Sequence, residues 1–214
     1  MSEKNTLWSF GDSFSTPYGD KPYKVCDDYI NYKGYEPKMF SNIIAETLGM
    51  NCVINAKGGL DNYSIMENVC NITDKVTDGD LIIIGWSHIN RFRMVKQNGE
   101  WIPILPFLRL NKFEEFNMDM LDIFAVNRHD FEDKYTNEVN SWIKLIDLAY
   151  KNCTVIHWSA HQKTKINATI IKNITTISKE TKNKIEDTHH SEIGQKELSN
   201  IFLNKILKKE INLL

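Results

Sequence analysis

The run Leu81-Ile82-Ile83-Ile84 is the feature that most constrains the fold of this chain. It lies between Asp78-Gly79-Asp80 and Gly85, and glycine and aspartate are typical of turns. A short, uninterrupted apolar run between turns is typical of a strand that is buried on both faces, as in a parallel sheet covered by helices. The run therefore predicts the centre of an α/β layer structure.

Three further apolar runs predict strands, at 6–10, 52–54 and 153–156. Apolar residues with helical spacing lie between or after these runs and predict helices at 37–49, 61–72, 129–150 and 191–207. Alternating strands and helices predict an α/β fold with a mainly parallel sheet. No linker-like composition interrupts the pattern, so we expect a single domain over residues 1–214.

Other segments depart from this alternation. Asn98-Gly99 between two apolar runs predicts a β-hairpin inserted after the third strand. Prolines and glycines between residues 16 and 36 predict a long loop beside Ser13. Residues 163–184 combine the Ile and Thr of a strand with the Lys and Asn of a loop or lid, and both interpretations stay open. Residues 111–124 show a weak helical pattern.

The composition excludes several classes of protein. With 26 basic and 28 acidic residues the formal net charge is -2, which lacks the basic excess of a nucleic-acid-binding protein. Four cysteines without CxxC spacing indicate neither a zinc knuckle nor a redox motif. Neither a signal-peptide pattern nor an apolar run of about 20 residues is present, so we expect a soluble, cytoplasmic protein that does not bind membranes.

Two polar motifs lie near opposite ends of the chain. Gly11-Asp12-Ser13 follows the first predicted strand, and open α/β sheets carry their ligand sites where the strands end. A serine hydroxyl becomes a nucleophile only with a base and a group that orients the base. Asp187-Thr188-His189-His190 offers a carboxylate and two imidazoles. Together these motifs predict serine hydrolase chemistry, if folding brings them to one edge of the sheet.

A pair of glycines, Gly58-Gly59, follows the second predicted strand. Paired glycines allow the backbone N–H groups of a turn to point toward an anion. Asp61 is well placed to cap the helix that comes next.

With these motifs the chain resembles the SGNH (GDSL-type) hydrolase family over nearly its whole length, including stand-alone, signal-less phage and bacterial members. The first motif matches the block that carries the family's nucleophile, which implies Ser13. Gly59 is similar to the glycine whose N–H serves the oxyanion hole. Asp187 and His189, with Gly194 downstream, are similar to the final block. The resemblance implies a flavodoxin-like three-layer α/β/α sandwich with about five strands.

The third block departs from the family pattern. Gly85-Trp86-Ser87-His88 stands where the family usually has Gly-x-Asn-Asp, so Ser87 replaces the asparagine of the oxyanion hole. The Ser87 hydroxyl, the Asn62 amide and a nearby imidazole are the candidate substitutes, and His88 is expected to line the substrate site. Family members also have Asp-x-x-His, so His190 stays an alternative to His189 as the base.

The resemblance implies a serine esterase that needs no cofactor and acts on small acyl esters, among them O-acetyl groups on carbohydrate. An acyltransferase and a non-catalytic binding or structural module with the same fold stay open as alternatives. A zinc site would draw on Asp12 and five histidines: His88, His157, His161, His189 and His190. The sequence has no His-x-His or His-Glu-x-x-His spacing, which argues against such a site. Three tryptophans either pack in the core or form an aromatic wall for a sugar or acyl chain: Trp86, Trp101 and Trp158. Nothing in the sequence indicates the oligomeric state.

Overall fold

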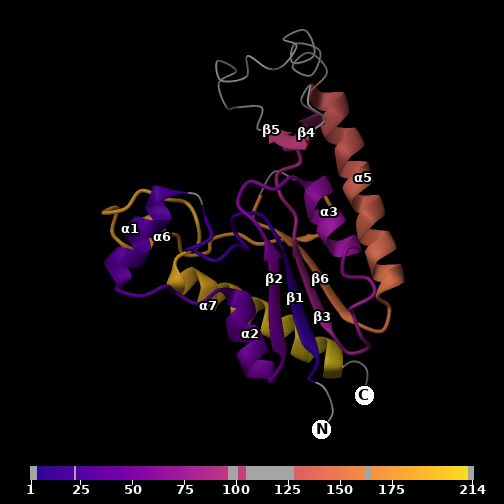
Figure 1. Ribbon diagram of the computed structural model, residues 1–214, viewed down its shortest axis with the longest axis horizontal. Helices are drawn as coiled ribbons and strands as arrows, with labels where there is room; N and C mark the ends of the chain where they lie inside the picture. The colour runs from indigo at the N-terminus through magenta and orange to yellow at the C-terminus, as the bar shows by residue number, and fades with distance from the viewer. Residues whose placement is uncertain (1–3, 22, 96–100, 105–127, 162–164, 212–214) are drawn as a thin grey trace.

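A five-stranded, all-parallel sheet forms the centre of the molecule (Figure 1). The computed structural model describes residues 4–21, 23–95, 101–104, 128–161 and 165–211. The strands lie in the order β2-β1-β3-β6-β7. Their bounds are Thr6–Gly11 for β1, Asn51–Ala56 for β2, Leu81–Gly85 for β3, Thr154–Ser159 for β6 and Thr169–Ile170 for β7. The predicted parallel sheet of about five strands is confirmed.

Helices cover both faces of the sheet, which makes a three-layer α/β/α sandwich (Figure 1). On one face, α2 (Phe40–Leu48) and α7 (Glu192–Ile211) pack over strand residues such as Leu81 and Ile83. On the other face, α3 (Asn62–Cys70) and α5 (Arg128–Ala149) pack over residues such as Ile82 and Ile84. Successive strand residues point to opposite faces, so an uninterrupted apolar run fills both cores. The predicted flavodoxin-like architecture is confirmed.

The register of the sheet brings several strand ends to one level. Gly11 at the end of β1 lies beside Ala56 at the end of β2. Phe10 pairs with Ile84, and Gly85 pairs with Trp158. The loops that follow β1, β2, β3 and β6 therefore meet at the carboxyl edge of the sheet, where ligand sites of such folds lie.

The predicted hairpin is present beyond the end of β3 (Figure 1). Its strands, β4 (Phe92–Val95) and β5 (Trp101–Ile104), pair antiparallel. The Asn98-Gly99 turn lies outside the described residues, and so does the weak helical pattern at 111–124.

The prediction of a long loop over 16–36 is wrong, because α1 (Lys24–Lys33) occupies much of this segment. Cys26 and Tyr29 form its buried face, and Gly34, at φ 77°, ends it with an N–H that donates to the Ile30 carbonyl over 2.8 Å. The breaking residues that suggested a loop flank this helix rather than interrupt it. Helix α1 lies beside α6 (Ile177–Glu180), outside the sandwich (Figure 1).

The segment 163–184, which the sequence left between strand and loop, contributes both a short strand and a short helix. Its described residues include the edge strand β7 and the single turn of α6. Helix α2 ends at Gly49 as predicted, although it begins at Phe40 rather than next to Pro37. Among the described residues, no helix has the length and apolar character that crossing a membrane requires.

Candidate active site

The turn after β1 holds Ser13 in a fixed, buried position. The Phe14 N–H donates to Asp12 Oδ1 over 3.1 Å, and the Ser15 N–H donates to the Asp12 carbonyl over 2.9 Å. A Cβ at Gly11 would clash with the Ser15 side chain and lie 3.0 Å from the Gly85 carbonyl, so the chain needs glycine there. Ser13 is 5% exposed, and no group among the described residues hydrogen-bonds its hydroxyl.

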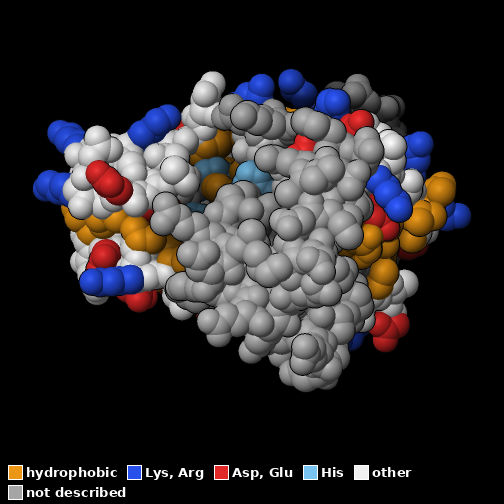
Figure 2. All heavy atoms as spheres, turned by 90° about the horizontal axis from the view of Figure 1, so that it is seen from above, with side chains coloured by type: hydrophobic (Ala, Val, Ile, Leu, Met, Phe, Trp, Pro, Cys, Tyr) orange, Lys and Arg blue, Asp and Glu red, His pale blue; other side chains and the backbone are white. Residues whose placement is uncertain are grey.

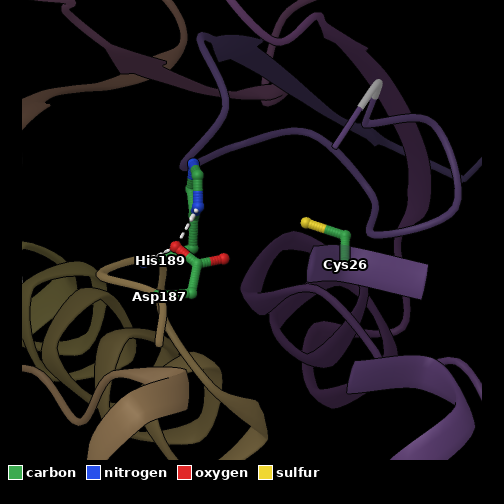
Figure 3. Close-up of side chains that lie close together, drawn as sticks. All are labelled: Cys26, Asp187 and His189. Atoms are coloured by element: carbon green, nitrogen blue, oxygen red, sulfur yellow. Dashed lines mark hydrogen bonds and ion pairs between the residues drawn. The ribbon is translucent and has the colours of Figure 1, made fainter. Parts of the chain in front are cut away.

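Asp187 and His189 form a hydrogen-bonded pair (Figure 3). His189 Nδ1 lies 2.7 Å from Asp187 Oδ1, and the His189 backbone N–H donates to the same oxygen over 3.0 Å. Because an ionised carboxylate only accepts, Nδ1 of the ring donates the proton of this hydrogen bond. Burial acts to raise the pKa of Asp187, but the hydrogen bonds from His189 outweigh it and lower the pKa.

The beginning of α6 positions this pair. The Ser178 N–H donates to the Asp187 carbonyl over 3.1 Å, and the Asp187 N–H donates to Ser178 Oγ over 2.7 Å. The Ile177 N–H donates to the His189 carbonyl over 2.9 Å. The backbone on both sides of the pair is therefore fixed by one short helix.

Ring contacts bring His189 to the serine turn. The Phe14 ring lies 5.2 Å from the His189 ring between centroids, and Tyr23 stacks on His189 at 5.7 Å. Phe14 follows Ser13 directly, so the imidazole lies next to the turn that holds the hydroxyl. Figure 3 shows the ring extending away from the carboxylate. Seen from above, histidine and hydrophobic side chains lie in a hollow of the surface (Figure 2).

His190, the alternative base, has different surroundings. It is 6% exposed, and its ring packs against Phe14 at 5.0 Å and Trp158 at 6.3 Å. Burial, with a smaller effect from the charge of Lys21, lowers the pKa of His190 to about 3. Its Nδ1 is buried without a hydrogen-bond partner among the described residues. The Asp187 carboxylate thus pairs with His189 and not with His190.

Gly59, Asn62 and Ser87, which were considered as oxyanion donors, lie in the turn after β2, at the first position of α3 and after β3. Gly59, at φ 87°, lies in the turn after β2. Asn62 Oδ1 accepts from the Ser87 N–H over 2.8 Å, and Asn62 Nδ2 donates to the Ser87 carbonyl over 3.3 Å. The Ser87 hydroxyl donates to Asp12 Oδ2 over 2.9 Å. The structure therefore joins Asn62 and Ser87 to each other and to the serine turn, and the hydroxyl proton of Ser87 is already engaged.

Asp12 is the centre of a polar cluster. The sequence grouped Asp12 with His161 only as possible zinc ligands, and it did not point to Arg91. Its Oδ2 also accepts from Arg91 Nη1 over 3.2 Å and lies 3.3 Å from His161 Nε2. Burial acts to raise the pKa of Asp12, but His161 and Arg91 outweigh it and lower the pKa to about 2. Arg91 belongs to no periodic pattern, so only its six-residue distance from the end of β3 placed it near this edge.

His88 belongs to the same cluster. Its ring lies 3.4 Å from that of His161 between centroids. Burial, with the nearby charges of His161 and Arg91, lowers the pKa of His88 to about 4. A neutral His88 at the end of β3 is consistent with a residue that lines the site, and this role stays a prediction.

The tryptophans at the strand ends pack in the core. Trp86 and Trp158 are each 1% exposed, on opposite faces of the sheet, so neither forms the aromatic wall considered above. The side chain of Trp101 lies outside the described residues.

One group of side chains has the donor types of a metal site, within the part of the chain that the structure describes. Ligand atoms of Cys26, Asp187 and His189 lie within 4.8 Å of one another (Figure 3). Burial raises the pKa of the Cys26 thiol to about 11, which disfavours the thiolate that binds metals. An ion bound to His189 Nδ1 would also replace the hydrogen bond to Asp187. The six residues considered for zinc do not come together. Asp12, His88 and His161 lie in the Asp12 cluster. His189 pairs with Asp187, His157 contacts Asp147, and His190 packs against Phe14 and Trp158.

No protein-family model and no curated protein matches the sequence. Among the solved structures that match is one with a TM-score of 0.54 and 15% sequence identity, over 97% of this chain and 69% of the other. It is a carbohydrate esterase whose active site is described as displaying divergent catalytic and non-catalytic binding functions. At this level of identity the likeness establishes a shared α/β fold.

Proposed function

We propose that the protein is a serine esterase of the SGNH (GDSL) type, with Ser13 as nucleophile, His189 as base and Asp187 as the acid that orients the base. The observation that carries the proposal is the 2.7 Å pair of Asp187 and His189, whose ring packs on the residue next to Ser13. Residues 174 positions apart in the chain are thereby brought to one edge of the sheet.

The protonation of the pair supports this division of roles. His189 donates from Nδ1, so Nε2 accepts the proton of Ser13 as its oxygen attacks the ester carbonyl. The lowered pKa of Asp187 keeps its carboxylate ionised, which stabilises the imidazolium that forms. His189 then protonates the leaving alcohol, and a water molecule releases the acyl group by the same steps in reverse.

The oxyanion of the tetrahedral intermediate is received by the backbone N–H groups of Ser13 and Gly59. Preorganised donors of this kind stabilise charge that develops only in the transition state. Neither these groups nor the acid–base pair requires a cofactor or a metal. For the substrate we propose small acyl esters, including O-acetyl groups on carbohydrate, which agrees with the carbohydrate esterase that shares the fold.

A fluorophosphonate probe tests the nucleophile directly. We expect the probe to label Ser13, as read by peptide mapping, and Ser13→Ala to lower the hydrolysis of p-nitrophenyl acetate by at least ~10³-fold. Ser15→Ala is the matched control, because Ser15 is also buried in this turn and its Oγ has no described partner. Equal release of p-nitrophenol by the wild type and Ser13→Ala would overturn the proposal.

A non-catalytic binding module is the second candidate, and the engaged Ser87 hydroxyl favours it, since Ser87 replaces the usual oxyanion asparagine. The same experiment separates the two functions, because a binding module is not labelled at Ser13. Acyl release that appears only after a sugar acceptor is added would instead indicate a transferase.

A further inference from the structure

We propose that Arg91 is a positioning residue that fixes the two turns of the oxyanion hole relative to each other, in place of the asparagine that this chain lacks. The inference rests on the proposed function and concerns the same site. It accounts for a feature that the acid–base pair leaves unexplained, namely a buried arginine beside the nucleophile turn.

The geometry that supports the proposal is a bridge made by one nitrogen. Arg91 Nη1 donates to Asp12 Oδ2 over 3.2 Å and to the Leu60 carbonyl over 3.1 Å. Asp12 directly precedes Ser13, and Leu60 directly follows Gly59. The two acceptors thus lie on the residues next to Ser13 and Gly59, whose N–H groups are the proposed oxyanion donors. The bridge therefore sets the separation of these two N–H groups.

The other polar groups of this edge complete the frame. Ser87 donates its hydroxyl to Asp12, and Asn62 holds the Ser87 backbone with both ends of its amide. These bonds join the turns after β1 and β3 to the start of α3, and the Lys57 N–H donates to the Gly11 carbonyl over 3.2 Å. Arg91 adds a side-chain bond from Asp12 to Leu60, the neighbour of Gly59.

Burial makes the bridge effective. The Arg91 and Asp12 side chains are 10% and 5% exposed, so water competes little for their hydrogen bonds. The guanidinium also brings a permanent positive charge to the site where negative charge develops, and its planar fork fixes direction better than an ammonium does. Arg91 itself is fixed by a backbone bond of 3.0 Å from its N–H to the His88 carbonyl.

The test is steady-state kinetics of Arg91→Ala with p-nitrophenyl acetate. We expect kcat to fall by ~10²-fold, comparable to the loss of one oxyanion donor, while KM changes less than about threefold. Added guanidinium chloride at concentrations that leave the protein folded is expected to restore kcat severalfold in this variant and not in the wild type. A purely structural role would not produce that rescue.

Two further variants keep the result interpretable. Arg91→Lys retains the charge, and we expect it to keep more kcat than Arg91→Ala, which makes it the variant to measure if the alanine protein does not fold. Lys38→Ala removes an exposed ion pair, the 2.7 Å contact with Glu46, and is expected to leave kcat unchanged.

The outcomes separate this inference from the function on which it rests. A wild type without hydrolysis and without labelling of Ser13 overturns the proposed function, and the role of Arg91 with it. An active wild type with a folded Arg91→Ala protein of unchanged kcat overturns only the role of Arg91. So does a loss of kcat that guanidinium fails to restore while Arg91→Lys is as impaired as Arg91→Ala.

Discussion

His189 and His190 are neighbours in the chain with opposite surroundings. His189 pairs with Asp187 and keeps 16% of its side chain exposed, whereas His190 is buried between Phe14 and Trp158. Side chains of consecutive residues in an extended segment point to opposite sides, so residues 187 and 189 share one side and 190 faces the other. One residue of spacing thus separates a group that reaches the site from one that packs in the interior.

This difference predicts that the same substitution lowers kcat strongly at position 189 and changes it little at position 190. His189→Gln is expected to lower kcat for p-nitrophenyl acetate by at least ~10³-fold, because glutamine cannot accept and return the serine proton. His190→Gln is expected to keep kcat within about threefold, since His190 supplies no group to the reaction. If the larger loss occurs at position 190, His189 is not the base.

His190 also predicts how stability depends on pH. Its folded-state pKa of about 3 lies below the ordinary value of 6.5, so between these pH values the unfolded chain binds the proton and the folded protein does not. The contribution of His190 to the free energy of unfolding is therefore fully present above about pH 6.5. It decreases as the pH falls toward 3, by at most about 1.4 kcal/mol per pH unit.

Urea unfolding at pH 7, 5.5 and 4.5 measures this effect. We expect His190→Gln to have a flatter profile than the wild type, because glutamine does not titrate. Part of the slope is expected to persist, since the pKa of His88 is lowered to about 4 and acts in the same direction. Parallel profiles for both proteins would contradict the prediction.

At the scale of elements, the first turn of α7 fits tightly against the strand-like segment before α6. The Ser191 N–H and hydroxyl both donate to the Thr175 carbonyl, over 3.0 and 3.1 Å. Ser191 Oγ also accepts from the Gly194 N–H over 3.2 Å and so caps the start of this helix. These bonds hold the ends of the segment that carries Asp187 and His189.

Gly194 is where this contact is most sensitive to substitution. A Cβ there would overlap the Thr175 carbonyl and lie 2.9 Å from Ile174, and backbone atoms cannot simply rotate away. We expect Gly194→Ala to lower the free energy of unfolding by about 1–3 kcal/mol, as overpacking does. Urea titration measures the loss.

Gly49→Ala is the matched control, because a Cβ at Gly49 meets nothing within 4 Å and only its positive φ of 68° is strained. A Gly194→Ala protein that is no less stable than Gly49→Ala would contradict the packing argument.

The elements that the sequence predicted are those with a simple local cause. Uninterrupted apolar runs identified β1 and β3, and the asparagine–glycine pair identified the hairpin. Helix α1 was missed because its short apolar face, Cys26 and Tyr29, is buried only through contact with distant residues such as Ile177. Tertiary contact, rather than local preference, decides such a helix.

The same distinction applies to the site. The resemblance to the family's final block suggested the pair of Asp187 and His189, with His190 as the alternative, because all three residues lie in one short segment. The bonds of Arg91 to Asp12 and Leu60 join three separate loops, and their geometry depends on the register of β1, β2 and β3. No spacing within the chain indicates such a contact.

At the scale of the whole molecule, three apolar clusters stabilise the fold. Two lie on the faces of the sheet, and the third joins the segments around α1 and α6: Tyr18, Cys26, Tyr29, Met39 and Ile177. Because each cluster combines residues from distant parts of the sequence, we expect none to persist when another is lost. The chain is therefore predicted to unfold as one domain.

Far-ultraviolet circular dichroism and tryptophan fluorescence, followed together in urea, test this prediction. Both signals are expected to change in one coincident transition, as for a two-state domain. Separate midpoints would indicate that α1 and α6 form an independent unit.

The position of the two motifs in the sequence also has a consequence for biosynthesis. Ser13 is translated before β2, whereas Asp187 and His189 are translated after β6 and β7. A nascent polypeptide on the ribosome, or a fragment cleaved within α5, carries the hydroxyl without its general base. On the proposed mechanism, acyl transfer therefore cannot begin before the segment that carries Asp187 and His189 has been synthesised and folded.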